Sequence, residues 1–267
     1  MDKFKLGVVG YGNMATSILN GILKSNIIAK SDIIVCDVDS KKLAKLNLTT
    51  TTNCQDVFDN AEYILLSVKP QIFNKLQDKE LYSTKASAII SIMAGKNIST
   101  IKNKFLEKPT VVRIMPNTPC LVEEGMSGLV FDDTTDKNLI NFVTSVFNSI
   151  GKTLIINENQ IDNVSSISGS GPAYSYMFAN AIIKSAIEIG LSYEEAKLLT
   201  IQTIKGSCNM LEDATSTEDI DVLTERVCSK GGSTIEAVTH LKENNFDSII
   251  LDAIKKCKNR NLELSKI

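Results

Sequence analysis

The sequence predicts two domains, an α/β domain with a doubly wound parallel sheet followed by an all-helical domain. Up to residue 157, short runs rich in Val and Ile alternate with segments of helical period. From residue 158 onward, apolar residues recur at three-and-four spacing and no strand-like run is evident. Strands that are apolar almost throughout are typical of a parallel sheet covered by helices on both faces. We therefore expect domains at residues 1–157 and 158–267.

The N-terminal elements alternate in the order expected of such a sheet. The strand-like runs are FKLGVVG, DIIVCD, AEYILLSV, ASAIISIM, PTVVRIM and GKTLIIN, and segments of helical period among them are MATSILNGILKS, SKKLAKL and PQIFNKLQ. In open α/β sheets the ligand crevice lies outside the carboxyl ends of the strands. The turns that follow these strands are therefore the first candidates for a binding site.

The first of these turns, within VVGYGNMATSIL, has a glycine pattern typical of dinucleotide binding. Gly10 permits a tight turn, Gly12 allows the backbone to approach a pyrophosphate, and the small Ala15 allows close packing of helix and strand. The start of the following helix offers free N–H groups and the positive end of its dipole. The position between a strand and a helix favours dinucleotide binding over a purely structural turn.

The end of the second strand bears on the choice between NADH and NADPH. Asp37 lies where such folds place the residue that contacts the adenosine ribose. Its carboxylate would accept hydrogen bonds from both ribose hydroxyls and repel a 2′-phosphate, which favours NADH. Lys41 and Lys42 could instead accommodate the phosphate, although lysines in a first helical turn are more often solvated. Both cofactors stay open, with NADH favoured.

Three later segments are candidates for the same crevice. The turns SVKP (67–70) and SIMAG (91–95) should flank the nicotinamide half, and the rigid loop RIMPNTP (113–119) should face it; ordinary strand-to-helix turns are the alternative. SGSGPAY (168–174) is expected to break and restart a helix, with Ser170 near an N-cap, or to face a substrate. The helix that follows is apolar around most of its circumference, so we expect its own domain or a second subunit to bury it.

Composition and charge disfavour several classes of function. A formal net charge of −2 provides no basic field for nucleic acid or an anionic membrane. No secretory signal and no run of about 18 apolar residues is present, so we expect a cytoplasmic protein. The 6 cysteines lack CxxC spacing and His240 is the single histidine, which predicts reduced thiols and no metal site. The expected partners are a small molecule and a second copy of the chain.

Taken together, GYGNMA, SVKP, SIMAG, RIMPNTP, SGSGPAY and SKGGSTIEAV make the chain resemble the pyrroline-5-carboxylate reductases over almost its whole length. The last two motifs are the specific ones, because the first would fit any Rossmann dehydrogenase. The resemblance implies reduction of the C=N bond of 1-pyrroline-5-carboxylate to L-proline with NAD(P)H, the last step of proline biosynthesis. It also implies an N-terminal Rossmann domain and a C-terminal helical dimerisation domain whose helices interleave in a homodimer. Partner residues would then complete each pocket, and dimers could assemble further.

Matched motif by motif, the resemblance also implies the site residues. With Asp37, the cofactor site would comprise Val9, Gly10, Tyr11, Gly12, Asn13, Met14, Asn53, Ser67, Val68, Lys69, Pro70, Ile92, Met93 and Ala94. The substrate site would comprise Glu158, Gly232, Ser233 and Thr234. N–H groups at the helix start after GGST would hold the substrate carboxylate. The Thr234 hydroxyl, the expected catalytic group, would hydrogen-bond the ring nitrogen.

Two positions depart from the family pattern, and two rival functions stay open. Lys230 replaces the proline of a Ser-Pro-Gly-Gly turn and either touches an anionic ligand or points to water, and Arg226 replaces an Asn that faces the cofactor. A β-hydroxyacid dehydrogenase would need a lysine on the helix after the glycine-rich break, but the first one there is Lys184, some three turns into the helix. A non-catalytic dinucleotide-binding sensor would not need the GGST turn.

Overall fold

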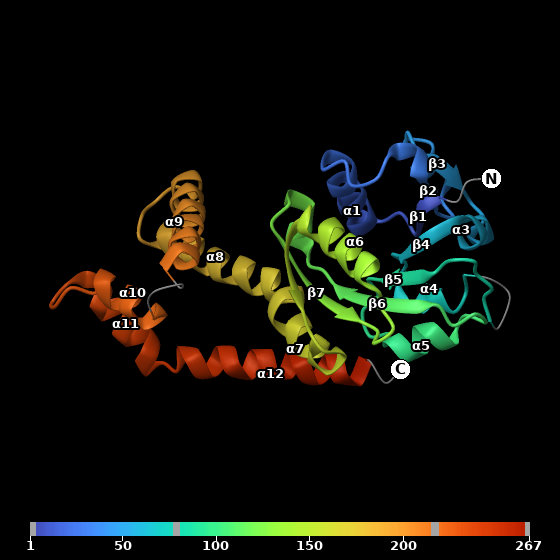
Figure 1. The fold of residues 1–267 in the computed structure, drawn as a ribbon. Coiled ribbons are helices and arrows are strands. Elements are labelled where there is room, and N and C mark those ends of the chain that lie inside the picture. Colours follow the sequence, from blue (N-terminus) through green and yellow to red (C-terminus); the bar gives the residue numbers. More distant parts are fainter. Residues whose placement is uncertain (1–3, 77–80, 215–218, 265–267) are drawn as a thin grey trace. The chain divides into compact units, whose positions relative to one another are not determined.

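The structure is a computed structural model that describes residues 4–76, 81–214 and 219–264 (Figure 1). The chain forms two compact units, one comprising Met1–Ser170 and Cys257–Ile267 and the other Gly171–Lys256. The second unit thus begins later than the domain boundary expected at residue 158. The reason is that the short helix α7 (Ile161–Val164) contacts a strand of the sheet and stays with the first unit.

An eight-stranded sheet forms the centre of the first unit. In sheet order its strands are β3 (Thr49–Thr51), β2 (Ile33–Cys36), β1 (Phe4–Val9), β4 (Ala61–Leu66), β5 (Ala88–Ser91), β6 (Thr110–Met115), β7 (Gly125–Phe131) and β8 (Gly151–Ile155). Among the described strands, every neighbouring pair is parallel except β6 and β7. The chain builds outward from β1 in both directions, so the switch point of the topology lies between β1 and β4. The predicted doubly wound α/β fold is confirmed.

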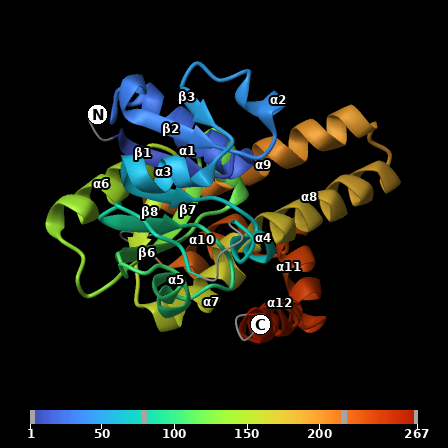
Figure 2. The ribbon, with the colours of Figure 1, turned by 90° about the vertical axis from the view of Figure 1, so that its right-hand side faces the viewer.

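Helices cover both faces of this sheet (Figure 2). On one face, α1 (Asn13–Lys24) and α6 (Lys137–Asn148) pack in one core cluster with residues such as Val8 and Val35. On the other face, α3 (Cys54–Asn60), α4 (Pro70–Phe73) and α5 (Ile98–Asn103) pack in a second cluster with residues such as Val9. Successive strand residues point to opposite faces, and both faces are buried here. This explains why the strands are apolar throughout.

The structure contains elements that the sequence did not predict. These are the strands β3 and β7 and the helices α3, α5 and α6. Strand β7 was missed because glycines interrupt it, and packing explains one of them: a Cβ at Gly125 would lie 2.1 Å from Cys120 Sγ. Glycine lowers the strand signal of a sequence even where close packing requires it.

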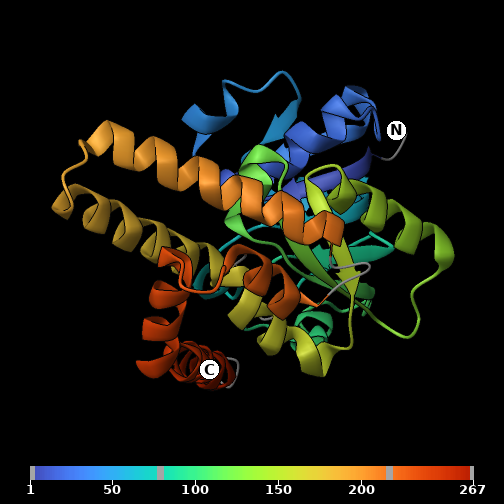
Figure 3. The ribbon, with the colours of Figure 1, turned by 90° about the vertical axis from the view of Figure 1, so that its left-hand side faces the viewer.

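After residue 157 the described chain is helical, as predicted. The elements are a 3-10 turn (Glu158–Gln160), α7, a π-helical turn (Ser165–Gly169), α8 (Gly171–Glu188), α9 (Tyr193–Ala214), α10 (Ile220–Val227), α11 (Ser233–Glu243) and α12 (Phe246–Leu264). Helices α8 and α9 lie side by side and antiparallel in the second unit (Figure 3). No helix in the described part of the chain is long and apolar enough to cross a lipid bilayer.

The helical elements end and restart within the SGSG segment, because the π-helical turn ends at Gly169 and α8 begins at Gly171, but Ser170 between them is not the N-cap residue that was expected. Ser170 has helical backbone angles (φ −92, ψ −18) instead of the extended ones of an N-cap residue. Its N–H donates to the carbonyl of Ser165 (2.9 Å), five residues earlier, which is the hydrogen bond of a π turn. The chain therefore widens in a π turn before α8 begins.

Helix α8 is largely exposed in the single chain. Tyr176, Met177 and Phe178 are 67%, 72% and 49% exposed, and none of the described residues of this helix is buried. An apolar helix in this state needs a further covering surface. The sequence left open whether the helix is buried by its own domain or by a second subunit, and its own domain leaves most of it exposed.

Candidate active site

The glycine loop lies at the carboxyl end of β1 and is held by the neighbouring strands. The N–H of Gly10 donates to the carbonyl of Cys36 (2.8 Å), and the φ of Gly10 is +93°. A Cβ at Gly10 would lie 2.6 Å from the carbonyl oxygen of Ser67, so the turn requires glycine. Ala15, the third small residue of the pattern, is buried against the sheet. The roles predicted for these residues in turn formation and packing match the geometry.

The start of α1 offers the donors that a pyrophosphate needs. Gly12 is the N-cap residue, with extended backbone angles, and within the described residues no side chain caps this helix. A Cβ at Gly12 would meet no described atom within 4 Å, so the space beside it is open. An uncapped helix N-terminus next to open space suits an anionic group. The residues of this loop therefore fit a dinucleotide.

Asp37 lies directly beside the glycine loop. Its Oδ2 accepts from the N–H of Tyr11 (2.7 Å) and its Oδ1 from the N–H of Asp39 (2.9 Å). The Nζ of Lys42 lies 4.0 Å from Oδ1, and the Asp37 side chain is 10% exposed. The structure thus brings together the carboxylate that favours NADH and one of the two lysines that could favour NADPH.

The other predicted cofactor residues differ in what they can offer a ligand. Asn53 caps α3, because its Oδ1 accepts from the N–H of Gln55 (3.1 Å). Met93 is buried in the core, so its backbone is the part that could line a site. Pro70, at the start of α4, and Ala94, after β5, both line a cavity of about 410 Å³.

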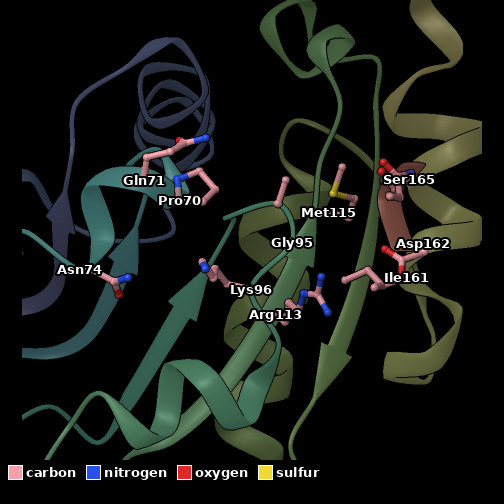
Figure 4. A pocket seen from close by; sticks show the side chains of 12 residues that line it. Pro70, Gln71, Asn74, Gly95, Lys96, Arg113, Met115, Ile161, Asp162 and Ser165 are labelled. Atoms are coloured by element: carbon pink, nitrogen blue, oxygen red, sulfur yellow. The ribbon is translucent and has the colours of Figure 1, made fainter. Parts of the chain in front are cut away.

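This cavity also contains charged side chains to which no role was assigned from the sequence, although Arg113 belongs to the RIMPNTP loop expected at the crevice (Figure 4). Lys96 and Arg113 lie on the side of β5 and β6, and Asp162 of α7 lies opposite them (Figure 4). Arg113 is the last but two residue of β6, its side chain is 7% exposed, and its Nε has no hydrogen-bond partner among the described residues. A single arginine in the apolar run TVVRIM was the signal that could have identified it.

Glu158 is positioned next to Arg113. Its Oε1 lies 3.3 Å from Nη1 of Arg113 and accepts from the N–H of Ile98 (2.8 Å), while its side chain is 36% exposed. Of the RIMPNTP loop, Asn117 is tied to its neighbours: it donates to the carbonyl of Ser168 (3.0 Å) and accepts from the N–H of Met126 (2.9 Å). Polar contacts between residues far apart in sequence therefore fix the Glu158 side chain and the RIMPNTP loop.

The GGST turn lies in the second unit and is described by itself. Gly231 has a φ of +74°, and Gly232 is the N-cap residue of α11, with no side-chain cap among the described residues. Ser233 and Lys230 are exposed and Thr234 is half-buried on the first turn of this helix. This start of α11 therefore has free N–H groups and a hydroxyl on one turn, as the sequence predicted.

Comparison with known families agrees with this arrangement. The family model "Pyrroline-5-carboxylate reductase dimerisation" matches residues 158–264, and the model "NADP oxidoreductase coenzyme F420-dependent" matches residues 5–95. The chain is 32% identical to pyrroline-5-carboxylate reductase 2 of Bacillus subtilis, covering 98% of this chain and 95% of that protein. It is also 32% identical to pyrroline-5-carboxylate reductase of Escherichia coli, covering 100% of both.

Solved structures give the same result. A pyrroline-5-carboxylate reductase of Coxiella burnetii has a TM-score of 0.87 at 29% identity, with 100% of both chains covered. A pyrroline carboxylate reductase of Plasmodium falciparum with NADP bound has a TM-score of 0.83 at 29% identity, with 99% of both chains covered.

These matches decide between the functions that the sequence left open. They exclude the β-hydroxyacid dehydrogenase and the non-catalytic sensor, and they indicate NAD(P)H as the cofactor. The match to a dimerisation model, together with the exposed apolar surface of α8, indicates that the chain self-associates. The chain therefore belongs to the pyrroline-5-carboxylate reductases, the oxidoreductases that reduce 1-pyrroline-5-carboxylate to L-proline.

Proposed function

We propose that two glycine turns of this chain divide the work of the reduction. The loop at Gly10 and Gly12 holds NAD(P)H, and the turn at Gly231 and Gly232 holds the carboxylate and ring nitrogen of the substrate. The observation that carries this proposal is that both α1 and α11 begin without a side-chain cap among the described residues, each directly after one of these turns. Two uncapped helix starts offer two separate places for anionic groups.

The residues at the first turn favour NADH over NADPH. The bound cofactor supplies the hydride that is added to the imine carbon. Asp37, nearly buried and hydrogen-bonded to the loop itself, places a negative charge where a 2′-phosphate would have to lie. Lys42, at 4.0 Å, reduces this charge only in part, because its own side chain is 52% exposed and therefore solvated.

At the second turn, backbone and hydroxyl groups have separate tasks. The free N–H groups of the first turn of α11 donate to the substrate carboxylate. The hydroxyl of Thr234 donates to the ring nitrogen and stabilises the amine as it forms. No strong acid is required, because an imine that arrives protonated already carries the proton. Orientation of the two reactants then supplies much of the rate.

Glu158 suits a substrate that carries positive charge on its nitrogen. Arg113 and the N–H of Ile98 fix its carboxylate, yet a third of the side chain stays exposed. A fixed and accessible carboxylate attracts an iminium ion without having to reorganise.

We further propose that the functional form is a homodimer, able to assemble further, in which residues of a partner complete each site. The exposed apolar residues of α8 support this. The low formal charge of −2 argues against a nucleic-acid partner. Light scattering of the purified protein tests the dimer, and a monomer at micromolar concentration would contradict it.

Thr234→Ala tests the division of work. We expect kcat to fall roughly 100-fold, a typical loss for one positioned donor, while the Kd for NADH changes less than about twofold. Thr234→Ser keeps the hydroxyl and should retain most of the activity, and Thr239→Ala, at an exposed threonine further along α11, is the matched control. Equal losses of kcat and cofactor affinity would place Thr234 outside the chemistry. No consumption of NADH or NADPH by the unaltered protein with 1-pyrroline-5-carboxylate would refute the function itself.

A further inference from the structure

Two cysteines of the first unit lie in contact with each other. The Sγ atoms of Cys36 and Cys54 are 3.3 Å apart. Cys36 is fully buried, and Cys54 is 9% exposed. The two residues are far enough apart in sequence that only the fold brings them together: Cys36 ends β2 and Cys54 begins α3.

Their position connects them to three of the residues proposed to bind the cofactor. Cys36 directly precedes Asp37, and its carbonyl accepts the N–H of Gly10 in the glycine loop (2.8 Å). Cys54 directly follows Asn53, the N-cap residue of α3. Movement of either thiol is therefore transmitted through one peptide unit or one hydrogen bond to the adenosine side of the site.

We propose that Cys36 and Cys54 are an oxidation site, which forms a disulfide with a peroxide and thereby weakens NAD(P)H binding. The effect on binding rests on the cofactor site proposed above, whereas formation of the bond does not. The sequence spacing did not suggest this pair, because the cysteines are not in a CxxC motif.

The surroundings assign the two thiols different roles. The two thiols share a hydrogen bond in which either can be the donor; this bond lowers the pKa of the Cys54 thiol, whereas burial and the carboxylates of Asp37 and Asp56 oppose that shift. The hydrogen bond with Cys54, burial and the carboxylates of Asp37 and Asp56 all raise the pKa of the Cys36 thiol. Cys54 is the more exposed of the two and therefore the one that peroxide reaches first, and its thiolate is the nucleophile.

The chemistry balances with hydrogen peroxide as the oxidant. The Cys54 thiolate attacks one peroxide oxygen, the O–O bond breaks, and a sulfenic acid and hydroxide form; the hydroxide takes up the proton that Cys54 released. The Cys36 sulfur then attacks the sulfenic sulfur, the S–S bond forms, and the S–O bond breaks to release water together with the Cys36 proton. Two thiols lose two electrons in total, and one peroxide becomes two waters.

Bond formation must change the geometry next to the cofactor site. A disulfide has an S–S distance of about 2.0 Å, so the sulfurs must approach by roughly 1.3 Å from their present 3.3 Å. The proposed effect on binding requires that part of this approach comes from the backbone, with the end of β2 and the first turn of α3 moving toward each other. Asp37 then shifts relative to Tyr11, whose N–H it accepts at 2.7 Å, and the glycine loop is displaced.

The experiment uses the full-length protein, treated with hydrogen peroxide and then alkylated. Peptide mass spectrometry should show a bond between Cys36 and Cys54, and the KM for NADH should rise about tenfold, a shift of about 1.4 kcal/mol. Dithiothreitol should reverse both changes. By reciprocity, saturating NADH should lower the ratio of oxidised to reduced protein at equilibrium in a glutathione buffer by the factor by which oxidation raises the Kd for NADH.

Three variants serve as controls, each compared with its own untreated form. Cys36→Ser and Cys54→Ser should lose the peroxide effect on KM, whereas Cys208→Ser, which removes an exposed thiol of α9, should keep it. If the serine variants do not fold, the cross-link and the reversible KM of the unaltered protein decide the question.

Two results would overturn the proposal. One is the absence of the Cys36–Cys54 bond after oxidation, and the other is its formation with unchanged KM for NADH. If the adenosine half of the cofactor bound elsewhere, Asp37→Asn would not change the ratio of kcat/KM for NADPH and NADH. The Asp37→Asn measurement therefore distinguishes two failures: a cofactor site that was assigned wrongly, and a disulfide that forms beside the correct site but does not affect NADH binding.

Discussion

Replacing Gly12 with serine should weaken cofactor binding and leave the stability of the fold unchanged. The space beside Gly12 is open, its backbone angles are extended, and it occupies an N-cap, a position where serine is a preferred residue. The new side chain therefore meets no described atom and strains no dihedral angle. It fills the space through which the backbone would approach a pyrophosphate.

The magnitude follows from the contacts that would be lost. One hydrogen bond from a backbone N–H to a charged group contributes about 1.5–3 kcal/mol, so loss of one such bond should raise the Kd for NADH roughly 10- to 150-fold. Titration of the quenching or enhancement of NADH fluorescence measures this Kd, and thermal unfolding without cofactor measures stability. The midpoint should stay within about 2 °C of the unaltered protein.

Gly10→Ala, in the same loop, should have the opposite main effect and lower the stability of the fold. Its φ of +93° is unfavourable for alanine, and the Cβ would lie 2.6 Å from the Ser67 carbonyl oxygen. Strain of about 1–2 kcal/mol and overpacking of about 1–3 kcal/mol should lower the unfolding midpoint by roughly 5–15 °C. An unchanged NADH affinity in Gly12→Ser, or an unchanged midpoint in Gly10→Ala, would refute the reasoning.

Three further predictions concern charged groups. Asp37→Asn keeps an acceptor for the glycine loop but removes the charge, so kcat/KM for NADPH relative to NADH should rise about tenfold, and an unchanged ratio would contradict the assigned role. Arg113→Leu leaves Glu158 without its partner and should lower the free energy of unfolding in urea by about 1–3 kcal/mol, with Arg113→Lys in between. Hydrogen bonds from Ser83 and the N–H of Thr84 hold the pKa of Glu107 below its ordinary 4.5, with slight burial opposing. The stabilisation is therefore present above pH 4.5 and is lost as the pH falls through the lowered folded pKa. Glu107→Gln should cost about 0.5 kcal/mol at pH 7, after allowance for screening, and progressively less as the pH is lowered below 4.5.

Features whose signal is local in sequence could be predicted, and features that depend on distant partners could not. The glycine loop and the strands around it were predicted because a turn and a strand require particular residues at adjacent positions. The strand β7, antiparallel to β6, was missed because its glycines are required by close contacts with residues distant in sequence, such as Ile150 beside Gly125 and Val164 beside Gly128. The SGSG segment has the composition of a break with an N-cap, but the backbone at Ser170 is helical because its N–H closes a π turn to the Ser165 carbonyl.

The candidate site shows the same division. The glycine turns were visible in the sequence, whereas the pairing of Arg113 with Glu158 joins strands and turns 45 residues apart. The contact between Cys36 and Cys54 likewise depends on the packing of α3 against β2. Neither pairing has a spacing that a sequence pattern would reveal.

Because the apolar face of α8 is exposed in the single chain, the stability of the helical unit should depend on the protein concentration. Surface that a second copy covers contributes its hydrophobic free energy only in the associated state, which is favoured by concentration. The unfolding temperature of this enzyme should therefore rise with protein concentration. Dilution would loosen the helices that carry the GGST turn while the α/β unit, with its own two-sided core, stays folded.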